Sequence, residues 1–155
     1  MSKSLKRVRA ALDAAGIVTQ IVETPLARTA ADAAAALGCA VDQIAKSIIF
    51  RGDTSAEAIL FITAGGRQVD LAKAAAAVGE PLGKADAALI RSQTGFAIGG
   101  VSPIGHVSPI RAFADPYLAN FDVIWAAAGT PHHVFSATPA EIFQMSGAQI
   151  IDFTT

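Results

Sequence analysis

The chain has 155 residues, with 12 Lys or Arg and 13 Asp or Glu, and therefore a formal net charge of −1. This length predicts a single domain over residues 1–155, with a core large enough to fold without disulfides or a structural metal. The near-zero charge excludes a protein that holds nucleic acid by a strongly basic surface alone. Any nucleic acid should be bound through a few local contacts or with the help of a partner.

Membrane and secretion signals are absent from the sequence pattern. No apolar run approaches the roughly 20 residues needed to span a bilayer. The basic segment 1–10 is not followed by the apolar stretch of a secretory signal. Cys39 is the only cysteine, which excludes an intramolecular disulfide and a cysteine-based metal cluster. These features predict a cytoplasmic protein without membrane contact.

The chain begins with a predicted helix and strand. An apolar stripe at Leu5, Val8 and Leu12 predicts a helix, and Gly16 stands where a glycine commonly ends one. Residues 17–23 indicate a strand. The same helix carries four basic side chains, for which a solvated helix face and a phosphate-contacting patch are alternative interpretations: Lys3, Lys6, Arg7 and Arg9.

A second helix and a hairpin follow. Thr29 with Asp32 predicts the N-terminal cap of a short alanine-rich helix that Gly38 closes. Residues 46–51 and 57–63 are apolar, β-branched runs joined by polar turn residues, which predicts a β-hairpin.

The second half of the chain alternates short helices and strands. Helices are predicted from Asp70 to Val78 and over residues 86–93, each followed by glycine. Strands are expected at 96–98, 122–127 and 133–136.

The last helix has the clearest local signal. Thr138-Pro139-Ala140-Glu141 combines a cap, proline at the first helical position and a glutamate three residues after the cap. This helix should end near Gly147, before a final strand at 149–153. Because strands and helices do not repeat as strict βαβ units, the pattern predicts a mixed α/β (α+β) domain rather than a Rossmann or TIM plan.

Two features of the sequence could carry chemistry. Lys46 opens an apolar strand, where a lysine either extends its ammonium group to solvent or faces a cleft. Residues 99–106 read Gly-Gly-Val-Ser-Pro-Ile-Gly-His. The paired glycines allow positive φ angles and the close approach of another molecule, and Pro103 stiffens the segment. The loop is either an ordinary connector or a set of amides that can hold a developing oxyanion.

Other kinds of site are not expected. The chain has no Walker loop, dinucleotide fingerprint, nucleophile elbow or zinc-protease helix. His132 and His133 are adjacent on a predicted strand, so they point to opposite faces and would not bind one metal together. We therefore expect no metal.

Three motifs in this order resemble the YbaK/ProX family. They are a lysine at the head of the strand 46–50 after the helix at Thr29, a Gly-x-x-x-Pro loop at 99–103, and a strand at 129–135 that leads into Thr138-Pro139. The resemblance extends from about Val8 to Phe153. This family includes free-standing proteins and an editing domain inserted in bacterial prolyl-tRNA synthetases.

The resemblance implies a fold and an activity. The fold is one domain with a curled mixed β-sheet, short helices around it and a cleft for the 3′ end of aminoacyl-tRNA. Members hydrolyse the ester of a wrongly attached amino acid without any cofactor. The chain is therefore expected to be a trans-editing deacylase for a small amino acid, with tRNA-Pro as the expected tRNA. Prolyl-tRNA synthetase or an elongation factor is a candidate partner. The alternative is a non-catalytic tRNA- or synthetase-binding module of the same fold.

The resemblance also assigns residues. Lys46 is the expected essential lysine. The loop expected to cradle the aminoacyl group consists of Gly99, Gly100, Val101, Ser102 and Pro103.

Amides around Gly100 and Val101 should hold the oxyanion while water attacks the ester. His132 or His133 is expected to bind substrate, and the pattern does not decide between them. Thr29 and Ile62 are candidate pocket residues.

Overall fold

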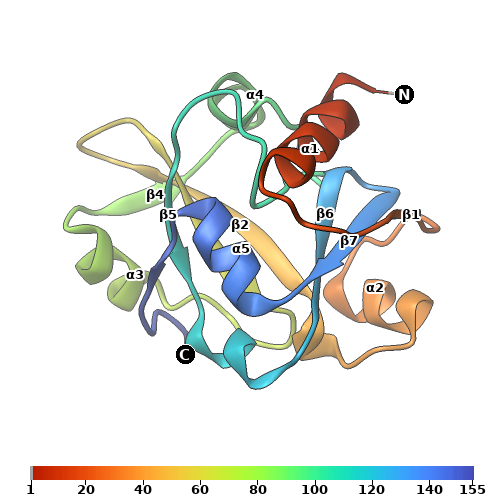
Figure 1. Cartoon of the computed structure of the whole chain (residues 1–155). Helices are drawn as coiled ribbons and strands as arrows, with labels where there is room; N and C mark the ends of the chain where they lie inside the picture. The colour runs from red at the N-terminus through yellow and green to blue at the C-terminus, as the bar shows by residue number, and fades with distance from the viewer. Residues whose placement is uncertain (1) are drawn as a thin grey trace.

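The computed structural model describes residues 2–155, which form five α-helices, two 3-10 turns and eight strands (Figure 1). The helices are α1 (Lys3–Ala14), α2 (Ala30–Leu37), α3 (Leu71–Val78), α4 (Ala87–Thr94) and α5 (Pro139–Ser146), with the turns η1 (Val41–Gln43) and η2 (Pro116–Asn120). The strands are β1 (Ile21–Glu23), β2 (Ala45–Gly52), β3 (Ala58–Ala64), β4 (Leu82–Lys84), β5 (Arg111–Ala114), β6 (Ile124–Thr130), β7 (His133–Ala137) and β8 (Gln149–Ile150).

The strands form two sheets. One has the order β4-β2-β3-β5-β8, in which β2 is antiparallel to both neighbours and β5 is parallel to β3 and β8. The other is the antiparallel sheet β1-β7-β6. A single parallel bridge between Ile44 and Trp125 connects the two sheets. The predicted mixed α/β fold is confirmed. Its strands divide between two sheets, which do not close into a barrel within residues 2–155.

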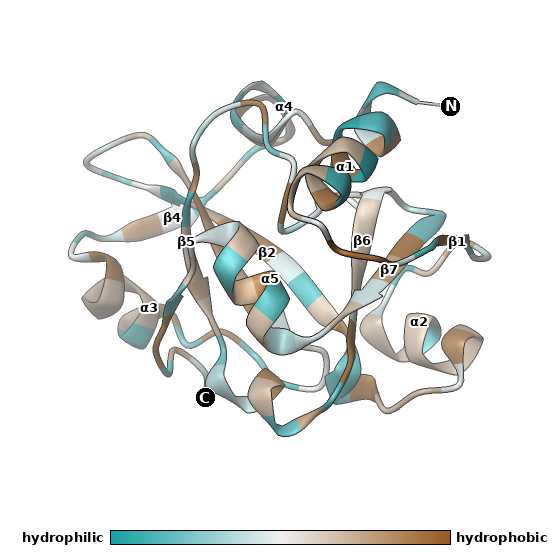
Figure 2. Cartoon of the chain, in the orientation of Figure 1, coloured by the Kyte–Doolittle hydropathy of each residue, from teal (hydrophilic) through white to brown (hydrophobic). Residues whose placement is uncertain are grey.

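Strand β3 separates two cores. All seven of its residues are buried, and successive side chains point to opposite faces. Leu60 and Ile62 belong to the larger core beneath α1, α4 and α5, while Ile59 and Phe61 pack with α3 on the other face. Helix α1 contributes Leu5, Val8 and Leu12 to the larger core, and Figure 2 shows that α1 carries both hydrophilic and hydrophobic residues.

The predicted helix caps at Thr29 and Thr138 are confirmed. Thr29 Oγ1 accepts a hydrogen bond from the Asp32 amide, and Thr138 with Glu141 forms the expected capping box. Helices α2, α3, α4 and α5 each end at a glycine with φ between +66° and +89°, a region that costs glycine little. The hairpin β2–β3 also forms as predicted.

Several predicted strands were wrong in place or length. Residues 96–98 form no strand, because Phe96 turns inward, becomes fully buried and donates its amide to Thr94 Oγ1. The expected strands at 17–23 and 149–153 shorten to β1 and β8, and the strands β4 and β5 were not predicted. No helix within residues 2–155 has the length and apolar character to cross a membrane.

Candidate functional site

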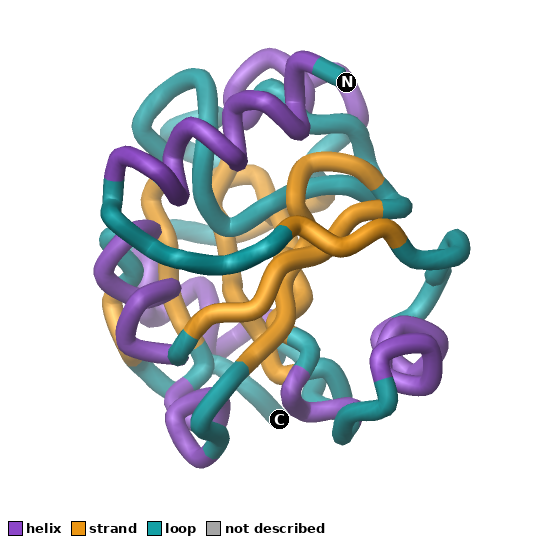
Figure 3. The backbone as a smooth tube through the Cα atoms, turned by 45° about the vertical axis from the view of Figure 1, so that its right-hand side comes forward, coloured by secondary structure: helices purple, strands orange, loops and turns teal. Residues whose placement is uncertain are grey.

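A cavity of about 670 Å³ lies where the two sheets diverge. Its walls come from β2, β6 and β7, from α2 with the segment before it, and from two loops. Figure 3, turned so that the α2 side comes forward, shows α2 held away from the strands by the loops at its ends. The polar side chains on the wall are Thr24, Arg28, Thr29, Lys46, Ser47, Gln68, Thr130 and His133.

The free edge of β2 forms one wall. β2 pairs with β3 from Ala45 to Arg51 but with β4 only from Phe50 to Gly52. A strand with a partner on one side leaves alternate N–H and C=O groups unpaired on the other. Lys46 and Ser47 lie on the part of β2 that has no β4 partner, and both line the cavity.

Lys46 lies on the cavity wall and is half-buried. Burial lowers the pKa of its ammonium group, and the negative charge of Asp42 partly offsets this effect. Within residues 2–155, no carboxylate lies within ion-pair distance of the Lys46 ammonium. The charge is therefore available to an anionic or carbonyl group in the cavity.

The residues of the glycine loop face in different directions. Gly99 and Val101 line the cavity, and Gly99 has φ +92° with open space where a side chain would stand. Gly100 instead packs against Thr130, and its amide donates to the Ala97 carbonyl at 3.0 Å. The expected oxyanion donor at Gly100 is thus corrected. The amides of Gly99 and Val101 make no hydrogen bond within residues 2–155 and remain as candidates.

The end of this loop lies away from the cavity. Ser102 is fully buried, and its carbonyl oxygen is 2.8 Å from His106 Nε2. Pro103 lines a separate hollow of about 430 Å³. A carbonyl oxygen can only accept, so His106 Nε2 is the donor. Burial lowers the pKa of the His106 imidazole, which favours its neutral form. Ser102 and Pro103 therefore support the loop and do not line the cavity.

Helix α1 holds both ends of the loop through Arg7. Its guanidinium donates to the carbonyl oxygens of Gly95 at 2.7 Å and Gly105 at 3.3 Å, and it lies over the Phe96 ring. Arg9 pairs with Asp13 on the same helix. Arg7 therefore belongs neither to a solvated helix face nor to a phosphate-contacting patch, because it fixes the loop.

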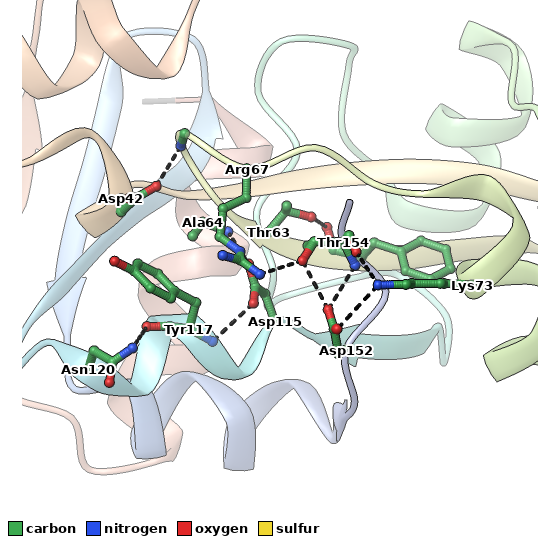
Figure 4. A network of polar contacts seen from close by, with 12 residues as sticks. Asp42, Thr63, Ala64, Arg67, Lys73, Asp115, Tyr117, Asn120, Asp152 and Thr154 are labelled. Atoms are coloured by element: carbon green, nitrogen blue, oxygen red, sulfur yellow. Dashed lines mark hydrogen bonds and ion pairs between the residues drawn. The ribbon is translucent and has the colours of Figure 1, made fainter.

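The second loop on the wall follows β3 and carries Gly65, Gly66 and Gln68. Asp42 accepts a hydrogen bond from the Gly66 amide at 2.8 Å. Arg67 pairs with the fully buried carboxylate of Asp115 at 3.1 Å (Figure 4). This loop is therefore fixed from both sides.

The C-terminal segment fixes the same loop. The Thr155 amide donates to the Gln68 carbonyl at 3.0 Å, and Thr154 forms a bridge with Val69. Figure 4 shows Thr154 between Arg67 and Asp152.

The two histidines separate, although not as neighbours on one strand: His133 begins β7, whereas His132 lies in the turn before it. His133 lines the cavity, with its Nδ1 atom 2.6 Å from Thr130 Oγ1. His132 is exposed and does not line it. His133 is therefore the histidine that the structure places at the candidate site.

Of the two predicted pocket residues, Thr29 and Ile62, only one lies on the cavity wall. Thr29 lines the cavity. Ile62 does not, because it is fully buried in the larger core, paired with Ser47. Sequence reasoning missed Arg28, Trp125 and Thr130, which also line the cavity. Within residues 2–155, no three His, Cys, Asp or Glu side chains form a group that could hold a metal ion.

Comparison with known families decides the identity. Residues 24–145 match the model of the aminoacyl-tRNA editing domain. The chain belongs to this family. The editing-domain chain is 30% identical over 122 residues to the uncharacterized protein YwhH of Bacillus subtilis (strain 168), which covers 79% of this chain and 77% of that protein. The resemblance to the YbaK/ProX family is thereby confirmed.

Solved structures agree with this assignment. One, described as a proposed trans-editing enzyme for prolyl tRNA synthetase, is 43% identical, with a TM-score of 0.92 over 100% of this chain and 99% of that chain. The hypothetical protein APE2540 is 23% identical, with a TM-score of 0.87 over 96% of this chain and 99% of that chain. The second match shows that the fold persists at low sequence identity.

Proposed function

We propose that this editing-domain protein is a trans-editing deacylase, which hydrolyses the ester that joins a small, wrongly attached amino acid to tRNA. tRNA-Pro is the first candidate, because a relative at 43% identity is described as a proposed trans-editing enzyme for prolyl tRNA synthetase. The observation that carries the proposal is that Lys46, Gly99 and Val101 line one cavity, and that the amides of Gly99 and Val101 have no hydrogen-bond partner within residues 2–155.

The walls of the cavity suit a small acyl group and the nucleoside that bears it. Its volume of about 670 Å³ lies in the range of about 300–1,000 Å³ typical of small-molecule sites. Small apolar side chains on α2 and β6 leave room for the acyl group, and Trp125 offers an aromatic surface. The alanines concerned are Ala30, Ala31, Ala33, Ala126 and Ala127.

The chemistry requires few protein groups. The oxygen of a water molecule bonds to the ester carbonyl carbon, and the bond from this carbon to the ribose oxygen then breaks. A proton from the water passes to the departing ribose oxygen, with the neighbouring ribose hydroxyl as its relay. The amides of Gly99 and Val101 stabilise the oxyanion, and water-excluded donors of this kind supply much of the rate enhancement in acyl transfer.

The basic side chains orient the ester. Lys46 and Arg28 are the Lys and Arg side chains on the wall within residues 2–155. Their charges attract the phosphate of the terminal nucleotide. Because the formal net charge is −1, the body of the tRNA is held weakly by this chain. Prolyl-tRNA synthetase or an elongation factor would supply the remaining affinity.

The test is a panel of tRNAs charged with the wrong amino acid and incubated with pure protein, with release of free amino acid as the readout. We expect rapid release from at least one mischarged tRNA-Pro and none from the correctly charged form. Tight binding of the charged tRNA without release, across the whole panel, would instead support the non-catalytic binding module.

A further inference from the structure

Thr130 contacts both functional parts of the cavity wall. Its backbone lies against Gly100, where a Cβ would stand 2.8 Å from the Thr130 Cα. Its hydroxyl oxygen accepts a hydrogen bond from the His132 amide at 3.1 Å and lies 2.6 Å from His133 Nδ1. One residue thus joins the glycine loop to the histidine of the cavity.

An irregularity in the β6–β7 pairing gives Thr130 this position. The register shifts between Ala127 and Thr130, and Thr130 then pairs with His133. Gly129 has φ +98° and packs against the Ser4 carbonyl of α1, where a Cβ would stand 2.9 Å away. Bulges commonly re-aim a side chain next to a functional site. Here the bulge directs the Thr130 hydroxyl at the imidazole ring.

The number of donors and acceptors determines which ring nitrogen carries the proton. A threonine hydroxyl has one hydrogen and two acceptor positions, and the His132 amide occupies one acceptor position. If the hydroxyl hydrogen points at His133 Nδ1, both Thr130 Oγ1 and Nδ1 have partners, and Nε2 is left for a ligand. If Nδ1 donated instead, the hydroxyl hydrogen would have no acceptor within residues 2–155. This count favours Nδ1 as the acceptor, with the proton of a neutral ring on Nε2.

We propose that Thr130 is a positioning residue that fixes His133 in the Nε2–H form, so that His133 donates a hydrogen bond to an oxygen of the bound aminoacyl ester. Because Nδ1 is occupied by Thr130, Nε2 is the ring nitrogen left for a ligand. In this form His133 orients the ester and does not act as the general base. The identity of the ligand in this inference rests on the proposed function, whereas the assignment of the ring proton to Nε2 does not.

The direct measurement is the tautomer of His133. Protein labelled with ¹⁵N-histidine is studied by long-range ¹H–¹⁵N NMR, which distinguishes a protonated from an unprotonated ring nitrogen. His132→Gln and His106→Gln identify the three histidine signals. Thr130→Val removes the hydroxyl with little change of shape, and Thr130→Ser keeps it. Thr54→Val makes the same chemical change in the exposed turn between β2 and β3 and is the matched control.

We expect the Nε2–H form of His133 in the wild-type protein, in Thr130→Ser and in Thr54→Val, and a mixture of both forms in Thr130→Val. The single-turnover deacylation rate of Thr130→Val should fall about tenfold, the effect of one lost orienting hydrogen bond, while Thr130→Ser stays within about threefold of wild type. The rates are compared per folded protein, as measured by circular dichroism.

Two results would overturn the proposal. One is an Nδ1–H form of His133 in the wild-type protein, a measurement that needs no substitution and no substrate. The other is a Thr130→Val rate within twofold of wild type although the tautomer has changed. Failure of the proposed function gives a different result, in which no mischarged tRNA is hydrolysed. The wild-type spectrum would still show which ring nitrogen of His133 carries the proton.

Discussion

Gly100 lies against the backbone of Thr130 so closely that a methyl group at position 100 would stand 2.8 Å from the Thr130 Cα and 3.0 Å from its carbonyl carbon. Both contacts are to backbone, which cannot move aside as a flexible side chain can. Glycine is therefore required at position 100 because the loop packs on β6, while the neighbouring Gly99 faces the cavity.

Gly100→Ala should destabilise the protein, because the loop must move away from Thr130. Overpacking of this kind typically costs about 1–3 kcal/mol in the free energy of unfolding, to be measured by urea denaturation. Gly147→Ala is the control, since Gly147 ends α5 with a positive φ and has open space at its Cβ. The free energy of unfolding of Gly147→Ala should fall only by the strain of an alanine at that positive φ, about 1 kcal/mol. A Gly100→Ala variant as stable as wild type would contradict the packing.

Lys46→Ala should abolish deacylation with little loss of stability. The side chain is half-buried on the cavity wall and has no ion pair within residues 2–155, so its removal breaks no polar contact of the fold. The measurement is the single-turnover rate together with the melting temperature. Lys84→Ala, at an exposed position on β4, is the matched control. Wild-type rates for Lys46→Ala would exclude the lysine from the chemistry.

Asp42→Asn should shift the pH dependence of the reaction. Burial lowers the pKa of Lys46 and the Asp42 charge raises it, so removal of the charge lowers this pKa further. If the ammonium form is the active one, activity is lost as the pH rises through the pKa of Lys46. The alkaline limb of the pH–rate profile should therefore move to lower pH in Asp42→Asn.

The asparagine variant isolates the charge effect. Its side-chain oxygen can still accept the Gly66 amide, which Asp42 Oδ1 does at 2.8 Å, whereas Asp42→Ala loses both charge and hydrogen bond. Spontaneous hydrolysis of the ester at each pH is subtracted from the measured rate. An alkaline limb at the same pH in wild type and Asp42→Asn would mean that Lys46 does not act through its charge.

Ser47→Ala should stabilise the protein. Ser47 Oγ is buried and has no hydrogen-bond partner within residues 2–155, and an unsatisfied buried polar group costs about 1–3 kcal/mol. The midpoint of urea unfolding should rise, by about 1 kcal/mol in free energy. Ser55→Ala is a useful contrast, because Ser55 Oγ donates to Glu80, and its loss should lower stability. A less stable Ser47→Ala would show that the hydroxyl has a partner in solution.

What the sequence predicted well depends on neighbours in the chain. The caps at Thr29 and Thr138 and the β2–β3 hairpin each rest on residues a few positions apart. Lys46 can be recognised as a candidate without any tertiary information, because a charge at the head of an apolar strand is unusual. These local rules gave the mixed α/β class and most helix boundaries.

What the sequence could not predict depends on distant partners. β5 pairs in parallel with β3 although about 50 residues separate them, and its four residues carry no periodic signal of their own. Arg7 holds carbonyl groups 88 and 98 residues away. The need for glycine at position 100 comes from Thr130. Loop chemistry suggests an oxyanion site around Gly100 and Val101, but only the fold shows that the Gly100 amide is already occupied.

The anchoring of Gln68 by Thr155 has a consequence for how the protein is made. The cavity wall runs from Thr24 to Val134, yet its loop after β3 is held by hydrogen bonds to residues 153 and 155. On the ribosome, β2 and β3 emerge long before that segment does. The last anchors of this cavity wall therefore form only after Phe153–Thr155 has been synthesised and has docked beside Val69, and a nascent chain stalled earlier lacks them.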